Sequence, residues 1–422
     1  MFKDRYDNVL TTSSADARDA YVQALDLMLA GQAGVVEAFR QSVQADPELA
    51  LGWVGLARAH HYQGDMPAVA QAMEKAVAQD ADLTPRETSH INAMGLMFAG
   101  KGPAAYQAIR AHVEQFPQDA LVAQTCSSVF GLIGFSGQPG REAEMLAFNA
   151  SLMPHYGDDW WAISQYAFAL CETGNLTKAD KLIDHALTLN PDNAHGAHVR
   201  SHVSYELGDT HGGRAYLADW LSRYDPQGIM FTHLNWHEAL WALEQGDIET
   251  MWAKVDAAVA PGTAPGGPAI NVLTDTASIL HRATLAGVTV TPDRWQSVSA
   301  FARQAFPKTG NAFIDIHAAL AHAMAGETEA LDQIIAHPAG PAADLVPDIA
   351  TGFSHVAAQN WVDAQRSLTR AMADLARIGG SRAQRDLVEQ TLATSLINQG
   401  KVDEARDIIA LRRPVLAGGI AA

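Results

Sequence analysis

The sequence contains only two cysteines, Cys126 and Cys171, among its 422 residues. Two thiols cannot build a disulfide framework or a cysteine-based zinc site. Each lies within a helical pattern, so we expect both to be small buried hydrophobic residues. The sequence also lacks an apolar run of about 18 residues, and its first ten residues have no apolar core of a signal peptide. We therefore expect no membrane span and a cytoplasmic location.

Basic side chains are scarce relative to acidic ones. There are 29 Lys and Arg residues against 47 Asp and Glu residues, which gives a formal net charge of −18. Such a surface repels phosphate groups, and no run of basic residues offsets it locally. We expect neither nucleic acid nor a membrane surface as a partner.

Strand patterns and several common enzyme motifs are also absent. The only short β-like run is Val-Thr-Val at 288–290. The sequence has no P-loop, no dinucleotide-binding glycine motif after a strand and no nucleophile elbow. These absences argue against a compact α/β enzyme.

What the sequence does contain is a repeat of about 37 residues. Glycines, with one asparagine, recur at intervals of 33 to 41 residues, and each ends one helical pattern and begins another. These positions are Gly31, Gly64, Gly100, Gly140, Gly174, Gly208, Gly246, Gly287, Gly326, Asn360 and Gly400. Around them, small and apolar residues recur at the helical spacings of three, four and seven. The pattern predicts about eleven helix–turn–helix hairpins and more than about 60% helix.

Two Gly/Pro-rich segments interrupt this regularity, at 134–141 and 261–272. We expect ordinary surface loops at both places. The alternative is that either loop caps one end of a groove.

The hairpins resemble tetratricopeptide repeats (TPRs), which cannot bury their apolar faces alone and therefore stack into a superhelix. The resemblance implies an all-α, TPR-like α-solenoid that runs through residues 1–422 as a single continuous domain. The segments HVRSHVSYELGD, HLNWHEALWALEQGD, DTASILHRATLAGVTV and FIDIHAALAHAMAG further resemble the tetratricopeptide repeat protein 38 family. That resemblance implies a fold and points to residues, but it implies no reaction.

Histidines and acidic residues concentrate on four consecutive first helices in the middle of the chain. Stacked helices lie about 8–10 Å apart, so we expect these side chains to converge on one concave pocket formed by residues 190–330. Burying so many histidines for packing alone would desolvate polar nitrogens without gain, which indicates a functional site. The candidate ligand-binding residues are His198, His202, Glu206, His233, Trp236, His237, Asp275, Arg282, Asp315 and His317.

Three kinds of chemistry fit these residues. The first is a divalent metal, because His198 and His202 have the spacing of helix-borne ligands; His237 is the third metal candidate, with His233 or Asp315 in its place as alternatives. The second is metal-free acid–base chemistry. Its catalytic candidates are His202, His237, Asp275 and Glu206. The third is recognition, in which Arg282 binds a carboxylate and tryptophans hold the apolar part of a ligand.

The sequence therefore predicts a TPR-like protein whose concave pocket binds a small polar ligand or peptide. One alternative is an enzyme, of hydrolase or lyase type, that uses the same pocket with or without a divalent metal. The other is a protein–protein scaffold whose groove accepts a segment of a partner. A homo-oligomer is compatible with each hypothesis.

Overall fold

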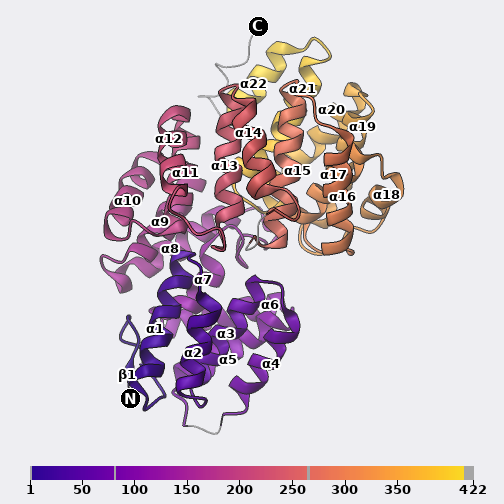
Figure 1. Cartoon of the computed structure of the whole chain (residues 1–422). Coiled ribbons are helices and arrows are strands. Elements are labelled where there is room, and N and C mark those ends of the chain that lie inside the picture. Colours follow the sequence, from indigo (N-terminus) through magenta and orange to yellow (C-terminus); the bar gives the residue numbers. More distant parts are fainter. Residues whose placement is uncertain (1, 80–81, 264–266, 413–422) are drawn as a thin grey trace.

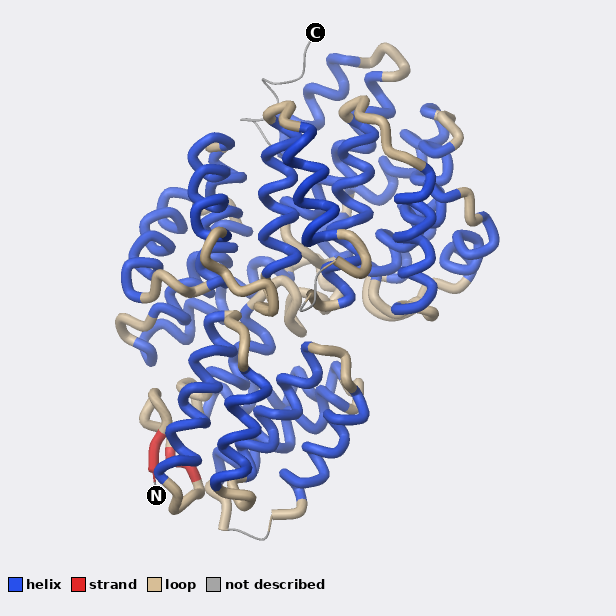
Figure 2. Tube along the Cα trace, viewed as in Figure 1, coloured by secondary structure: helices blue, strands red, loops and turns tan. Residues whose placement is uncertain are grey.

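The computed structural model describes residues 2–79, 82–263 and 267–412. These residues form 22 α-helices, and the structure is 73% helical, which confirms the predicted all-α class (Figures 1 and 2). The first helices of the hairpins are α1 (Ala15–Ala30), α3 (Ala50–Tyr62), α5 (Pro85–Phe98), α7 (Ala120–Ser127), α9 (Trp160–Glu172), α11 (Ala194–Leu207), α13 (Phe231–Glu244), α15 (Ala269–Leu285), α17 (Ala312–Ala325), α19 (Val346–Ala357) and α21 (Arg382–Ile397). The second helices are α2 (Val35–Ala45), α4 (Met66–Val77), α6 (Gly102–Gln115), α8 (Arg141–Tyr156), α10 (Leu176–Leu189), α12 (Thr210–Leu221), α14 (Ile248–Lys254), α16 (Pro292–Ala305), α18 (Thr328–Ala336), α20 (Trp361–Met372) and α22 (Val402–Arg412).

The helices pair in order into the eleven expected hairpins, with short irregular pieces between some of them. These pieces are the strands β1 (Phe2–Lys3) and β2 (Val9–Leu10), a π-helical turn η1 (Val255–Val259) that continues α14, and two 3₁₀ turns, η2 (Ala343–Leu345) and η3 (Leu375–Ile378). β1 and β2 form an antiparallel pair that the sequence did not predict, whereas the run at 288–290 is not a strand.

The turns of the hairpins follow the predicted positions, with two corrections. Nine of the ten glycines have a positive φ; Gly208, for example, has a φ of 72°. Gly140 instead has a φ of −93° and precedes α8. At the tenth turn the left-handed residue is Gln359, with a φ of 58°, and Asn360 directly precedes α20.

First and second helices differ in how much of their surface is buried. In the fifth hairpin, 12 of the 13 residues of α9 are buried, whereas in α10 only Ala179, Ile183 and Ala186 are. A helix that is covered on all sides must find partners for its polar side chains inside the protein. The first helices therefore hold the polar groups that could form an internal site.

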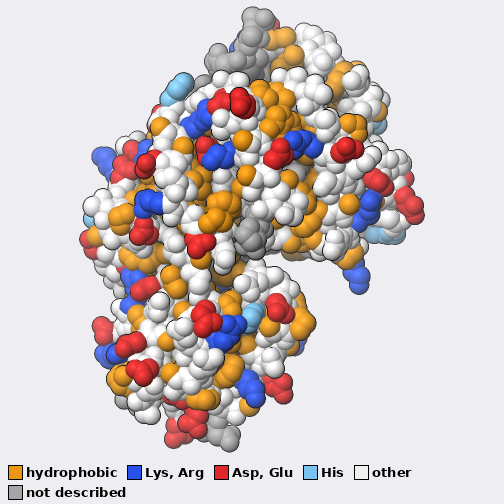
Figure 3. Space-filling view, viewed as in Figure 1, with side chains coloured by type: hydrophobic (Ala, Val, Ile, Leu, Met, Phe, Trp, Pro, Cys, Tyr) orange, Lys and Arg blue, Asp and Glu red, His pale blue; other side chains and the backbone are white. Residues whose placement is uncertain are grey.

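Both cysteines are fully buried, as expected. Across the described parts of the chain, no helix has the length and apolar character needed to cross a bilayer. On the face shown in Figure 3, acidic and basic side chains are interspersed, and a notch separates the N-terminal hairpins from α16 and α17.

The solenoid winds tightly enough for distant hairpins to touch. The turn after α1 reaches the sixth hairpin, where the Tyr224 hydroxyl donates a hydrogen bond to the carbonyl of Gly31. The side chain of Gln32 likewise donates to the carbonyl of Asp192. His195 lies so close to Gly31 that a Cβ there would be 3.1 Å from its Nε2.

A second long-range closure corrects one expectation about loops. The segment 134–141 is not an ordinary surface loop, because it packs against the connection between α20 and α21. Arg141 is buried and donates hydrogen bonds to the carbonyls of Gly134, Ala376 and Gly380. Nε of Arg377 returns a bond to the carbonyl of Gly137 at 2.9 Å. Of the other loop, 261–272, residues 264–266 lie outside the described residues.

This closure brings α21 onto the inner side of the solenoid, against the first helices α11 and α15. The hydroxyl of Tyr205 on α11 donates to Oδ2 of Asp386 at 2.9 Å. On α15, Nη2 of Arg282 donates to the carbonyl of Ala383 at 2.7 Å. The eleventh hairpin thus covers the middle of the chain.

Arg141 provides a test of this closure. Replacing Arg141 with Met removes the donor to the carbonyl of Gly134 and one of the donors to the carbonyls of Ala376 and Gly380. We therefore expect the free energy of unfolding to fall by about 2–4 kcal/mol. Arg370→Met is the matched control, because Arg370 makes an exposed ion pair with Asp348 and should change stability by less than about 1 kcal/mol. Equal effects of the two substitutions in urea denaturation would show that the contact contributes little.

Candidate metal centre

Two adjacent helices present a pair of histidines each to the same buried space. His198 and His202 lie one turn apart on α11, and His233 and His237 lie one turn apart on α13. Their relative exposures are 8%, 0%, 4% and 1%. One nitrogen of each ring can be chosen so that all four atoms lie within 4.8 Å of one another. Among the described residues, this is the one such group of three or more His, Cys, Asp or Glu side chains that could hold a metal.

The helix positions of these residues correct part of the prediction. His198 and His202 precede Gly208 by 10 and 6 residues, whereas His233 and His237 precede Gly246 by 13 and 9. The two pairs are therefore not at equivalent offsets. His233 follows His198 by 35 residues, and His237 follows His202 by the same number. The turn glycines are 38 residues apart, so the histidines meet because one helix is displaced along the other by nearly one turn.

Asp275 of α15 fixes the orientation of one ring. Its Oδ2 lies 2.8 Å from Nδ1 of His233. With the carboxylate as acceptor, Nδ1 holds the proton of the neutral ring and Nε2 presents a lone pair to the cluster. Burial raises the pKa of Asp275, and the contact with His233 acts in the opposite direction.

The Nε2 atoms of three rings meet at His198. Its Nε2 lies 2.8 Å from Nε2 of His202 and 3.1 Å from Nε2 of His233. A neutral imidazole has one N–H, so a proton on His198 Nε2 cannot form two full hydrogen bonds. Four nitrogens at about 2.0–2.1 Å from a tetrahedral ion are about 3.3–3.4 Å apart. This value lies between the shortest separation here, 2.8 Å, and the 4.8 Å within which all four ligand atoms lie. A cation in the cluster would satisfy lone pairs that protons cannot.

The fourth ring closes the group. The centroid of His237 lies 4.7 Å from that of His202, 4.9 Å from that of His233 and 5.3 Å from that of His198. Its Nε2 is buried and has no hydrogen-bond partner among the described residues. A buried nitrogen without a partner costs free energy unless a ligand takes its lone pair.

The surroundings keep two of these rings, His198 and His237, uncharged. Burial lowers the pKa of each well below the usual value, and the neighbouring imidazoles act in the same direction. The neutral imidazole is the form that binds metals. These two rings are therefore able to bind a cation at neutral pH.

Aromatic rings form the walls of the cluster. Trp236 stacks on His233, with ring centroids 5.0 Å apart and an angle of 14° between the planes. Phe168 of α9 lies 5.0 Å from the centroid of His202. Such packing fixes the ring orientations, because the imidazoles have no room to rotate.

Other predicted site residues are bound elsewhere. Arg282 donates to Ser278, Gln390 and the carbonyl of Ala383, so it anchors α21. Two further residues bond within their own segments. Asp315 accepts from the N–H of Gly310, and Nδ1 of His317 lies 2.7 Å from the carbonyl of Phe313.

Glu206 takes part in a charged contact with α21, in which its Oε2 lies 3.6 Å from Nε of Arg382. Arg382 in turn donates through its backbone N–H to Glu172. The predicted region 190–330 therefore omits α21. The histidine pattern of the sequence gave no indication of its residues.

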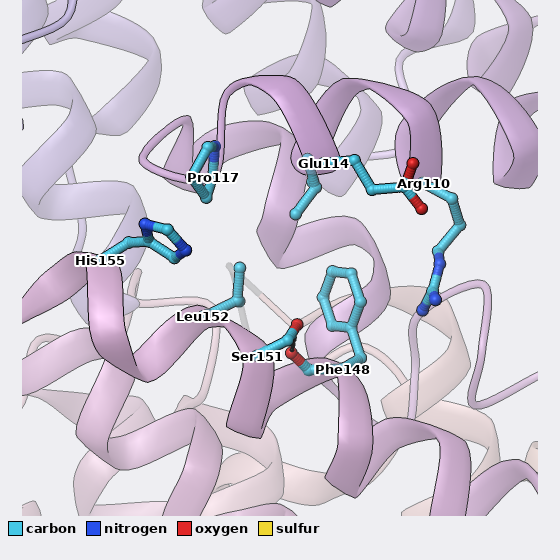
Figure 4. Close-up of a pocket in the computed structure, with 8 residues that line it drawn as sticks. Arg110, Glu114, Pro117, Phe148, Ser151, Leu152 and His155 are labelled. Carbon is cyan, nitrogen blue, oxygen red and sulfur yellow. Dashed lines mark hydrogen bonds between the residues drawn. The ribbon is translucent and has the colours of Figure 1, made fainter.

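Open pockets lie at other places. One of about 170 Å³ lies between α6 and α8, where Arg110, Glu114 and His155 surround an apolar floor (Figure 4). Another, of about 460 Å³, lies between α1 and α12. The predicted concave pocket is instead a closed cluster, because the hairpins pack around the histidines.

Comparisons with known proteins bear on the fold alone. No protein-family model matches the chain. Among solved structures, it is similar to a human IFIT1 dimer with PPP-AAAA, at 12% identity over 96% of each chain with a TM-score of 0.45. It is also similar to yeast Tom70, at 13% identity over 95% of this chain and 84% of that chain with a TM-score of 0.36. The eleven stacked hairpins of the chain itself make it a TPR-like helical-repeat protein. Its place in the tetratricopeptide repeat protein 38 family stays a prediction.

His322 of α17 is a buried histidine outside the cluster, and its protonation should make stability depend on pH. It hydrogen bonds with Ser299, and burial lowers its pKa to about 4. The unfolded value is about 6.5, so below pH 6.5 the unfolded chain takes up a proton that the folded chain does not. The stabilising effect of the neutral ring is thus complete above pH 6.5 and is lost toward pH 4.

We expect wild type to lose up to about 1.4 kcal/mol more stability per pH unit than His322→Asn within this window. Urea denaturation of both proteins at several pH values measures the two slopes. Parallel slopes would show that His322 titrates normally in the folded chain.

Proposed function

We propose that this helical-repeat protein binds one divalent transition-metal ion through His198, His202, His233 and His237. The supporting observation is the convergence of Nε2 atoms from three rings, with a fourth ring whose Nε2 has no other partner. The proposal narrows the predicted small polar ligand to a metal ion. It adds His233 to the three metal candidates that the sequence indicated.

The ligand atoms define the class of metal. Imidazole nitrogens suit zinc, copper, nickel, cobalt and iron, whereas magnesium and calcium prefer oxygen ligands. No carboxylate belongs to the group of four, and Asp275 contacts it only through His233. We therefore expect selectivity for a late first-row transition metal over magnesium or calcium.

The number of protein ligands favours a role in binding over a role in hydrolysis. Catalytic zinc sites keep one position for water, whereas structural sites use four protein ligands. Four buried imidazoles match the second type, so the hydrolase or lyase alternative has less support. A bound ion here would cross-link α11 to α13. The cytoplasmic location and the formation of a homo-oligomer remain predictions.

A peptide in the groove has less support than a metal ion. The inner side of α11 and α15 is occupied by α21 of the same chain, through Tyr205 and Arg282. A partner segment would have to displace this helix before it reached the cluster.

A metal titration tests the proposal. Protein stripped with a chelator should bind one zinc or cobalt per chain, and at 100 times its Kd the metal should add about 2.7 kcal/mol to the free energy of unfolding. His202→Ala and His237→Ala should each abolish most of this gain. Calorimetric titration and thermal melts with and without metal measure both effects.

His90→Ala is the control, because His90 is equally buried but lies on α5 in contact with Asp119. It should lower stability and keep the metal-dependent gain. If His202→Ala and His237→Ala lower stability by about 1–3 kcal/mol and wild type gains nothing from metal, these histidines are packing residues.

Asp275 should tune the affinity without binding the ion. Asp275→Leu removes the acceptor that holds Nδ1–H of His233, so we expect metal affinity to fall by about 10- to 100-fold. Asp275→Asn keeps an acceptor oxygen and should lose less. Equal affinities for wild type and Asp275→Leu would exclude this role.

A further inference from the structure

The helices that hold the cluster are also the helices to which α21 binds. On α11, Tyr205 follows His202 by three residues, about one turn, and donates to Asp386 of α21. On α15, His281 follows Asp275 by six residues, and its Nε2 lies 3.0 Å from Oγ1 of Thr391. The cluster and the contacts of α21 therefore share two rigid elements.

The buried surface of α21 is mixed. It combines the polar residues Gln384, Arg385, Asp386, Glu389 and Thr391 with apolar ones such as Leu387, Val388, Leu392 and Leu396. The hydrogen bonds that join α21 to α11 and α15 are contacts that water can replace when the surfaces separate. The bond from α9 has the same character, since Glu172 accepts the backbone N–H of Arg382.

We propose that α21 is a cover whose binding to α11 and α15 is coupled to occupation of the metal site. This inference depends on the proposed function. An ion bound by the histidines would cross-link α11 to α13, and the contact of Asp275 with His233 extends this constraint to α15. α21 bridges the outer ends of the same set, from Tyr205 on α11 to His281 on α15. Metal binding and cover closure thus favour the same arrangement of helices.

Coupling of this kind is reciprocal. If the ion strengthens the binding of α21, then α21 must strengthen the binding of the ion by the same factor. The four rings are at most 8% exposed when α21 is in place. Because α21 binds the helices that hold them, we expect the ion to exchange faster when α21 opens.

Hydrogen exchange of the full chain, with and without zinc, tests the coupling in wild type. We expect zinc to slow exchange in α21 (Arg382–Ile397) as well as in α11 and α13, and to leave α4 (Met66–Val77) unchanged. Slower exchange in α11 and α13 alone would overturn the coupling and leave the metal site intact. Absence of zinc binding would instead refute the proposed function.

A double substitution tests the reverse direction. Tyr205→Phe with Thr391→Val removes one hydroxyl from each of the two contacts of α21 and changes no histidine of the cluster. The zinc-loaded variant should release zinc to excess chelator about five-fold faster or more than wild type. The matched control is Tyr216→Phe with Thr369→Val, because neither residue bonds to α21; Thr369 donates within its own helix. Equal release rates for the three proteins would contradict the role of α21.

Discussion

Four imidazole rings share one buried space, and their protons are too few to satisfy their nitrogens. His233 donates its Nδ1–H to the carboxylate of Asp275, so its Nε2 faces His198 with a lone pair. Nε2 of His198 also lies 2.8 Å from Nε2 of His202. Burial disfavours the charged forms of His198 and His237, because it holds the pKa of each well below its usual value. In the proposed function, a cation at the point that the lone pairs share would satisfy these nitrogens.

The stacking of the hairpins creates this constraint. First helices such as α11 and α13 are covered by neighbours on nearly every side, and 11 of the 14 residues in each are buried. Histidines on such helices cannot turn toward solvent. The second closure, in which Arg141 holds the connection to α21, adds a cover from the far end of the chain. A site in the middle of the sequence thus depends on contacts between residues about 240 positions apart.

The local part of this structure could be predicted from the sequence, because turn glycines and helical spacing act within one hairpin. The eleven hairpins and the candidates His198, His202, His233, His237 and Asp275 all followed from such patterns. Equivalent offset from the turn was a poor guide to convergence. His237 and His317 both precede their glycines by nine residues, yet His317 bonds to Phe313 of its own helix. The axial displacement of neighbouring helices decides which residues meet, and side-chain packing sets it.

The role of α21 could not be predicted for a different reason. Superhelical closure adds up small rotations over many repeats, so no local pattern reveals that the eleventh hairpin reaches the sixth. The charged residues of α21 are typical of an exposed surface, and only the closed solenoid buries them.

X-ray absorption of the protein, expressed without a histidine tag and loaded with zinc, tests the central claim most directly. The account predicts one zinc per chain, surrounded by four nitrogen ligands at about 2.0–2.1 Å with the scattering pattern of imidazole. An ion surrounded mainly by oxygen, or the same spectrum from the His202→Ala variant, would contradict it.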